Sequence, residues 1–134
     1  LFEPYHSAIR ARMDVMEADG RNPVIVALHS FTPMMKDRGT PRPWEIGIIW
    51  NEDDRLARPV IEALRKKSPL TIGDNEPYSG RDGGFSLYAH PEARGHPHIG
   101  VEFRQDLVGT EEDAHKWAGI FGNALEIAVS SLTL

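Results

Sequence analysis

The sequence predicts a three-layer α/β/α domain built on a mixed, mostly parallel sheet. Helical and strand-like apolar patterns follow one another along the 134 residues in the order helix, strand, strand, helix, strand, strand, helix. Two of the strand-like runs end on groups that ionise, as occurs where the carboxyl ends of buried strands border a site. A chain of this length is expected to form one domain with its own hydrophobic core.

The first half of the chain is expected to contain two helices and two strands. Residues 4–17 carry apolar side chains three or four positions apart, which is typical of a helix with one buried face. Short apolar runs at 23–28 and 44–50 indicate strands, and the loop between them, 30–43, is long enough to be functional. Residues 55–67 again show helical spacing, with the apolar side chains on one face.

The second half repeats this alternation with a second long loop. A short strand is expected at 70–73, followed by a glycine-rich loop at 74–84 and a short helix or turn at 86–93. The fourth strand is expected at 98–103. A closing helix is expected at 111–132, where three acidic residues in the first turn suit the helix dipole.

The composition excludes several classes of protein. The net charge is −5 and no basic stripe with interleaved aromatic residues is present, so nucleic-acid binding is not expected. No cysteine occurs, which excludes a disulfide framework and a thiol nucleophile and suits a cytoplasmic protein. No apolar run approaches the roughly 20 residues of a membrane span. We therefore expect a cytoplasmic protein with a small-molecule substrate, whose oligomeric state the sequence does not indicate.

Two residues at strand ends are the first candidates for chemistry. His29 follows an apolar run and precedes the long polar loop, where it could be a metal ligand or a structural hydrogen-bonding residue. Glu102 lies between Val101 and Phe103, where burial of an isolated carboxylate is costly. It could be a general base whose pKa is tuned by partial burial, or the partner of Arg104 in an ion pair.

Four more residues are candidates for holding a ligand. Arg42 and Arg104 each offer a planar fork for a carboxylate or an oxyanion, and each could equally form a structural ion pair. Asn75 and Tyr78 lie in the glycine-rich loop, where their polar tips could face a ligand or serve the turn itself.

Taken together, the motifs of this chain resemble those of the N-formylglutamate amidohydrolase family. Six segments match in the family's order over nearly the whole chain, and six in order are far more specific than any one alone. They are Pro4-Tyr5-His6, His29-Ser30-Phe31-Thr32-Pro33, Arg42-Pro43-Trp44 with Ile46-Gly47-Ile48, Asn75-Glu76-Pro77-Tyr78-Ser79-Gly80, His90 before Gly95-His96-Pro97, and Glu102-Phe103-Arg104-Gln105-Asp106-Leu107.

The resemblance implies a zinc-exopeptidase-like fold, because the family is similar to the zinc-dependent carboxypeptidases. In those enzymes a His-Ser-aromatic segment supplies a zinc ligand, and a Glu-x-Arg strand supplies the catalytic glutamate. By that resemblance His29 is a zinc ligand and Glu102 is the base. The remaining candidates would assist catalysis or bind the carboxylates of the substrate; they are Arg104, Arg42, Asn75, Tyr78 and His90. His6 also matches a family position without an assigned role.

The expected activity is zinc-dependent hydrolysis of N-formylglutamate, or of a similar N-acyl amino acid, to formate and the free amino acid. Family members are longer, so residues 1–134 are expected to be a single but partial amidohydrolase domain. The part expected before Leu1 would carry the other metal ligands, since a catalytic zinc needs about three from the protein. Two alternatives remain open: a carboxypeptidase-like hydrolase of another amide, and a catalytically silent binding module.

Overall fold

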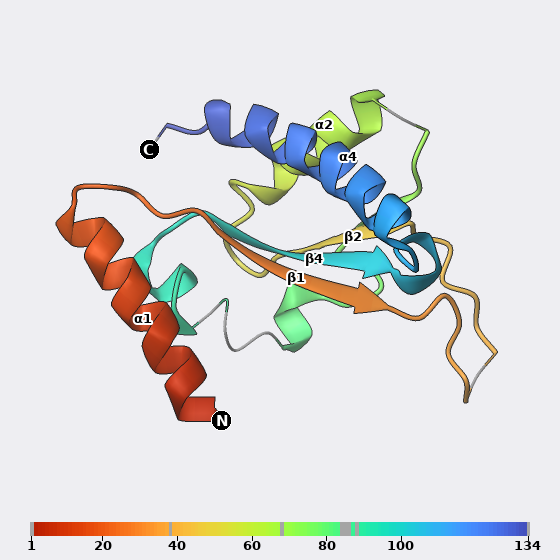
Figure 1. Cartoon of the computed structure of the whole chain (residues 1–134), viewed down its shortest axis with the longest axis horizontal. Coiled ribbons are helices and arrows are strands. Elements are labelled where there is room, and N and C mark those ends of the chain that lie inside the picture. Colours follow the sequence, from red (N-terminus) through yellow and green to blue (C-terminus); the bar gives the residue numbers. More distant parts are fainter. Residues whose placement is uncertain (1, 38, 68, 84–86, 88, 134) are drawn as a thin grey trace.

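The computed structural model describes residues 2–37, 39–67, 69–83, 87 and 89–133. The described helices and strands occur in the predicted order (Figure 1), with three short 3-10 turns between them. The helices are α1 Phe2–Ala18, α2 Ala57–Lys67 and α4 Glu111–Ser130; the strands are β1 Ile25–Phe31, β2 Ile46–Ile49, β3 Ile72–Asp74 and β4 His98–Arg104; the turns are η1 Gly80–Asp82, η2 Glu92–Arg94 and η3 Gln105–Leu107.

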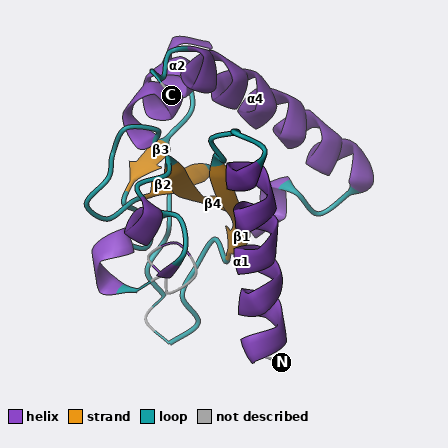
Figure 2. Ribbon diagram, turned by 90° about the vertical axis from the view of Figure 1, so that its left-hand side faces the viewer, coloured by secondary structure: helices purple, strands orange, loops and turns teal. Residues whose placement is uncertain are grey.

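The strand order in the sheet is β1-β4-β2-β3. β1 runs parallel to β4, β2 runs antiparallel to β4, and β3 runs parallel to β2. Helices α2 and α4 pack together over one face of the sheet, and α1 lies on the other side near one end (Figures 1 and 2). The predicted fold class, an α/β/α domain with a mixed and mostly parallel sheet, is confirmed.

The predicted elements differ from the described ones only at their ends. β1 extends to Phe31, so the first two residues of the predicted 30–43 loop belong to the strand. The expected helix or turn at 86–93 lies partly outside the described residues, which include the turn η2 at its end. Within the described part of the chain, no helix is both long enough and apolar enough to cross a membrane.

The hydrophobic core lies between the sheet and the two packed helices. Ile46 and Ile48 of β2 and Ile99 and Val101 of β4 are fully buried there. The ring of Phe103 meets two aromatic side chains of α4 edge-on, at centroid distances of 6.2 and 5.9 Å. Because side chains along a strand alternate between the two faces of the sheet, the residues between these core positions point to the opposite face.

The other face of the sheet carries the residues that sit between these core positions. In the β1–β4 pair, Ala27 is opposite Gly100 and His29 is opposite Glu102. In the β2–β4 pair, Gly47 is opposite Glu102. Small residues therefore surround the two ionisable ones on this face, which leaves room above the sheet for a pocket.

Candidate active site

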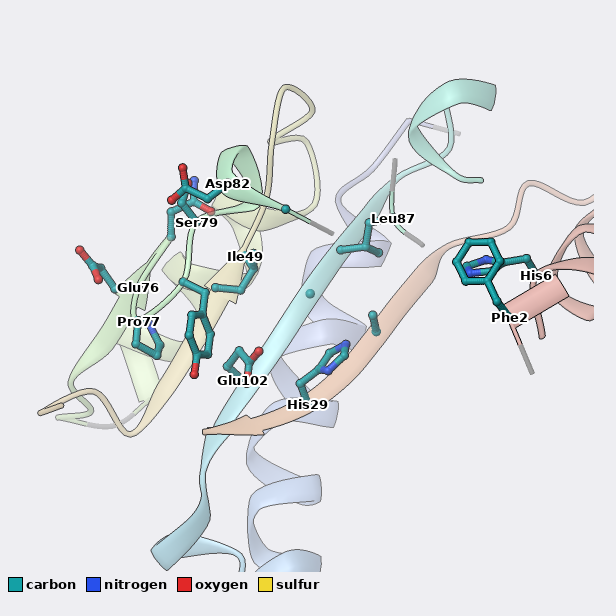
Figure 3. A pocket seen from close by; sticks show the side chains of 15 residues that line it. Phe2, His6, His29, Ile49, Glu76, Pro77, Ser79, Asp82, Leu87 and Glu102 are labelled. Carbon is teal, nitrogen blue, oxygen red and sulfur yellow. The ribbon is translucent and has the colours of Figure 1, made fainter. Parts of the chain in front are cut away.

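A pocket of about 620 Å³ lies over this second face of the sheet. Its floor is formed by residues of β1 and β4, and the loop over 75–83 forms one wall. Figure 3 shows His29 and Glu102 on adjacent strands at one end, with Phe2 and His6 from α1 at the other. Residues more than seventy positions apart in the sequence thus line one cavity.

His29 and Glu102 are neighbours because β1 and β4 are parallel and in register. They are direct partners across the two strands, so their side chains lie on the same face. Oε2 of Glu102 is buried and has no hydrogen-bond partner among the described residues. Burial raises the pKa of the Glu102 carboxyl, and the nearby charges of His29 and Arg42 act in the opposite direction. A carboxylate in this setting is suited to accept and return a proton.

Arg42 is held beside this pair by aromatic side chains and hydrogen bonds. Its guanidinium lies between the rings of Phe31 and Tyr78, at 5.8 and 5.0 Å from their centroids. Its Nη1 donates to the Tyr78 hydroxyl at 3.2 Å and to the carbonyl of Thr32 at 3.4 Å. The side chain is only 9% exposed, and Tyr78 rather than Arg42 lines the pocket. Arg42 therefore orients Tyr78 and places a positive charge near Glu102.

Asn75 lines the pocket and also fixes the shape of its wall. Its backbone has a φ of 56°, and its Oδ1 accepts hydrogen bonds from the backbone N–H groups of Trp50 and Gly80 at 2.9 and 3.1 Å. Both roles left open by the sequence, serving the turn and facing a ligand, are compatible with this position. The oxygen is used by the loop, and the amide nitrogen makes no hydrogen bond to any described residue.

Two glycines allow the loop to approach the sheet closely. A Cβ at Gly47 would lie 2.2 Å from the carbonyl oxygen of Glu76, and a Cβ at Gly73 would lie at the same distance. Any side chain at either position would displace the loop backbone. The resemblance to the family includes Gly47, and the structure supplies the physical reason for a glycine there.

Arg104 lies apart from the residues that line the pocket. Its Nε donates to Asp106 at 2.7 Å, and its Nη1 donates to the carbonyl of Pro43 at 3.2 Å. This guanidinium braces the loop that precedes β2, which corresponds to the structural alternative raised from the sequence. Arg104 is not among the residues that line the pocket, and its assignment to catalysis stays a prediction.

His90 lies behind His6, which itself lines the pocket. Nδ1 of His6 and Nε2 of His90 are 2.7 Å apart, and the two side chains are 4% and 2% exposed. Burial, followed by the proximity of His6, lowers the pKa of His90. The pair joins α1 to the segment before η2. The sequence indicates a family match but no role for His6, and it gives no signal for apolar lining residues such as Leu87.

The described residues contain no group of three or more His, Cys, Asp and Glu side chains arranged to hold a metal ion. His29 is the candidate ligand that the sequence singled out, and Glu102, the candidate base, is its partner across the two strands. A catalytic zinc needs about three protein ligands. The described residues do not by themselves provide three such ligands.

Comparisons with known proteins identify a family and two solved structures that this chain resembles. A family model described as N-formylglutamate amidohydrolase matches residues 1–108. A gene product of Agrobacterium tumefaciens of known structure is 32% identical with a TM-score of 0.91, and the match covers 98% of this chain and 51% of that one. An N-formylglutamate amidohydrolase from Ralstonia eutropha JMP134 is 22% identical with a TM-score of 0.68, covering 97% and 52%, and supports the fold alone. No curated protein matches the chain. The chain thus spans about half the length of these two solved structures.

Proposed function

Since this chain belongs to the N-formylglutamate amidohydrolase family, we propose that its pocket takes part in hydrolysing the formyl amide of N-formylglutamate or of a similar N-acyl amino acid. The observation that carries the proposal is the adjacency of His29 and Glu102 on one face of the sheet, at the floor of the pocket. The products would be formate, or another acid, and the free amino acid.

In the proposed reaction, Glu102 acts as the general base. Its carboxylate accepts a proton from the attacking water as the water oxygen bonds to the formyl carbon, and it then passes that proton to the leaving nitrogen as the C–N bond breaks. The burial that raises the pKa of Glu102 makes its carboxylate a stronger base and so favours removal of the proton from the attacking water. The water supplies the new oxygen of the formate and the hydrogen that Glu102 passes to the nitrogen. Its second hydrogen stays on the product carboxyl group and is lost when formic acid ionises, so the step balances.

Arg42 and Tyr78 would bind the anionic parts of the substrate. Tyr78 lines the pocket, and its hydroxyl accepts a hydrogen bond from Arg42. A hydroxyl that accepts a hydrogen bond from a guanidinium is a strengthened donor to a carboxylate or to the oxyanion formed during the reaction. The amide of Asn75 adds a second donor on the same wall.

Zinc dependence is part of the proposal, with His29 as one ligand. The other ligands would have to come from outside this sequence, because the described residues hold no cluster of three. The same observation favours a second candidate function for this chain taken alone, a binding module without catalytic activity. Zinc titration with metal analysis of the longest polypeptide made from the gene separates the two: stoichiometric zinc on three protein ligands supports the enzyme, and no zinc at high added concentration supports the binding module.

The test of the proposed reaction uses the longest polypeptide made from the gene. Formate release is measured from N-formylglutamate and from a panel of other N-formyl and N-acyl amino acids. Glu102→Gln should lower kcat by about 10²-fold or more, because the base is lost while the shape is kept. Glu126→Gln, on an exposed position of α4, is the matched control and should leave kcat unchanged. Wild-type rates in Glu102→Gln would contradict the assignment. Faster turnover of a peptide or another amide would favour a carboxypeptidase-like hydrolase.

A further inference from the structure

The candidate active-site pocket extends well beyond the residues assigned to the reaction. Glu102 and His29 lie at one end of it, and Phe2 of α1 lies at the other (Figure 3). Its volume of about 620 Å³ is within the range of sites that take ligands of drug size. A formyl group held at Glu102 would fill only a small part of this space. The remainder is available to the side chain of the amino acid.

An apolar stretch of the lining begins directly beside Glu102. Gly100 is two positions before Glu102 on β4, so both lie on the face that carries the pocket. A Cβ at Gly100 would lie 3.1 Å from Cβ of Ile49 and 3.4 Å from Cδ1 of Leu87, so these two side chains meet over the glycine. They are 8% and 6% exposed, and both line the pocket. Ala27, the partner of Gly100 across the two strands, adds a methyl group to the same stretch.

The charged groups around the pocket do not provide for a second carboxylate on the substrate. Among the described lining residues Glu76, Asp82 and Glu102 are acidic, and no lysine or arginine occurs. Glu76 and Asp82 are exposed, so water weakens their repulsion of an anion, but neither supplies a cation. Arg42 acts on Glu102 and contacts Tyr78, at the end where the α-carboxylate of any N-acyl amino acid could be bound.

The far end of the pocket presents mainly aromatic carbon. The ring of His6 lines this end and packs against the ring of Phe2, at a centroid distance of 4.2 Å. Nδ1 of His6 is 2.7 Å from Nε2 of His90, so this ring nitrogen is already engaged. A carboxylate that moved into the apolar stretch would lose hydration without gaining a guanidinium or ammonium partner from the described residues.

We propose that the pocket selects an N-formyl or similar N-acyl amino acid with an apolar side chain, such as that of leucine or methionine, in preference to N-formylglutamate. This inference rests on the proposed function and specifies the amino acid that the same site accepts. The formyl amide lies at Glu102, the α-carboxylate lies at Tyr78, and the apolar side chain packs against Ile49 and Leu87. A single methylene group in an apolar pocket changes kcat/KM by about 10–200-fold, so a leucine side chain is enough to set the preference.

The experiment compares N-formylleucine with N-formylglutamate on the longest polypeptide made from the gene. The readouts are kcat/KM for formate release by the wild type, and the affinity of Glu102→Gln measured by calorimetry, which does not require turnover. N-formylleucine should give a kcat/KM at least about tenfold higher and bind at least about tenfold more tightly. An equal or greater preference for N-formylglutamate would overturn this inference and leave the proposed function standing. Tighter binding of N-formylleucine without any formate release would instead contradict the proposed function while the side-chain preference holds.

Two variants test whether the apolar stretch is the source of the preference. Leu87→Ala should lower kcat/KM for N-formylleucine at least about tenfold and leave that for N-formylalanine nearly unchanged, because only the larger side chain reaches Leu87. Phe2→Lys places an ammonium at the far end of the pocket, at a position that is 61% exposed and therefore tolerant of the change. It should raise kcat/KM for N-formylglutamate by up to about fivefold, the effect of an exposed ion pair.

The matched control is Val15→Lys, at a position on α1 that is 50% exposed and not among the described residues lining the pocket. It makes the same change of charge and should leave kcat/KM for both substrates unchanged. If Leu87→Ala is folded and turns over N-formylleucine like the wild type, the assignment of the side chain to this stretch is wrong. If Leu87→Ala does not fold, Phe2→Lys decides: a ratio of the two substrates equal to that of Val15→Lys would overturn the inference.

Discussion

Glu102→Gln should make the protein more stable at neutral pH, because the native carboxylate is held in an unfavourable setting. Oε2 of Glu102 is buried without a hydrogen-bond partner among the described residues, and burial raises the pKa of the group. An unsatisfied buried polar atom costs about 1–3 kcal/mol, and more if it is charged. Glutamine has the same shape and removes the charge, but it keeps a polar amide that is also partly unsatisfied. We therefore expect a gain of about 1 kcal/mol, or about 3–5 °C in Tm for a chain of this size.

The pH dependence of that gain identifies its cause. A raised pKa in the folded state means that the folded protein binds a proton more readily than the unfolded chain, whose carboxyl titrates near 4.5. The penalty is absent below that value and develops as the pH rises through the folded pKa. Urea unfolding of wild type and Glu102→Gln at pH 4, 6 and 8 should show the difference growing with pH. Glu126→Gln, at an exposed position, should show no such trend. A variant less stable than wild type at pH 8, or a gain that is largest at pH 4, would refute this reasoning.

Three further predictions concern the framework of the site. Gly47→Ala should lower the free energy of unfolding by about 3 kcal/mol, because the new Cβ would lie 2.2 Å from the carbonyl oxygen of Glu76. Gly122→Ala, at a position on α4 where a Cβ would meet no other atom within 4 Å, should raise the free energy of unfolding by about 1 kcal/mol. Chemical denaturation compares the two variants, and equal effects would contradict the close approach of the loop to Gly47. Thr110→Ala should lower the free energy of unfolding by about 1 kcal/mol, because the Thr110 side chain caps the first turn of α4. Thr110→Ser should retain most of the stability of the wild type. An alanine variant as stable as the wild type would show that the cap contributes nothing. Burial and then the neighbouring histidine lower the pKa of His90 from 6.5, so the contribution of His90 to the free energy of unfolding should be constant above about pH 6.5 and fall below it; this slope should shrink in His90→Gln, and an unchanged slope would exclude His90 as its source.

The order of the elements could be predicted from the sequence because each element carries its own pattern. The helix Ala57–Lys67 buries the face that its apolar spacing indicates, and β2 is a short run in which every residue is buried. His29 and Glu102 stood out for the same local reason, as ionisable residues attached to apolar runs. Patterns of this kind depend on neighbours within a few positions, so a single sequence reveals them.

The roles of other residues could not be separated in this way. Arg42 and Arg104 offered the same two alternatives in the sequence. The structure places Arg42 against Tyr78 near Glu102, and it places Arg104 against Asp106 and the carbonyl of Pro43. His6 and His90 are 84 positions apart, and no local signal indicates that their rings meet. Contacts of this kind depend on how the chain folds back on itself.

The fold class, the family and the candidate residues His29 and Glu102 can all be predicted from the amino-acid sequence, because they depend on short patterns and on the order of motifs. That His29 and Glu102 are partners on one face follows from the fold, since their adjacency requires β1 and β4 to pair in parallel across more than seventy residues. The fold also decides which face of the sheet carries the pocket. Strand pairing is a non-local choice, governed by which apolar faces can be buried together, and no short segment encodes it.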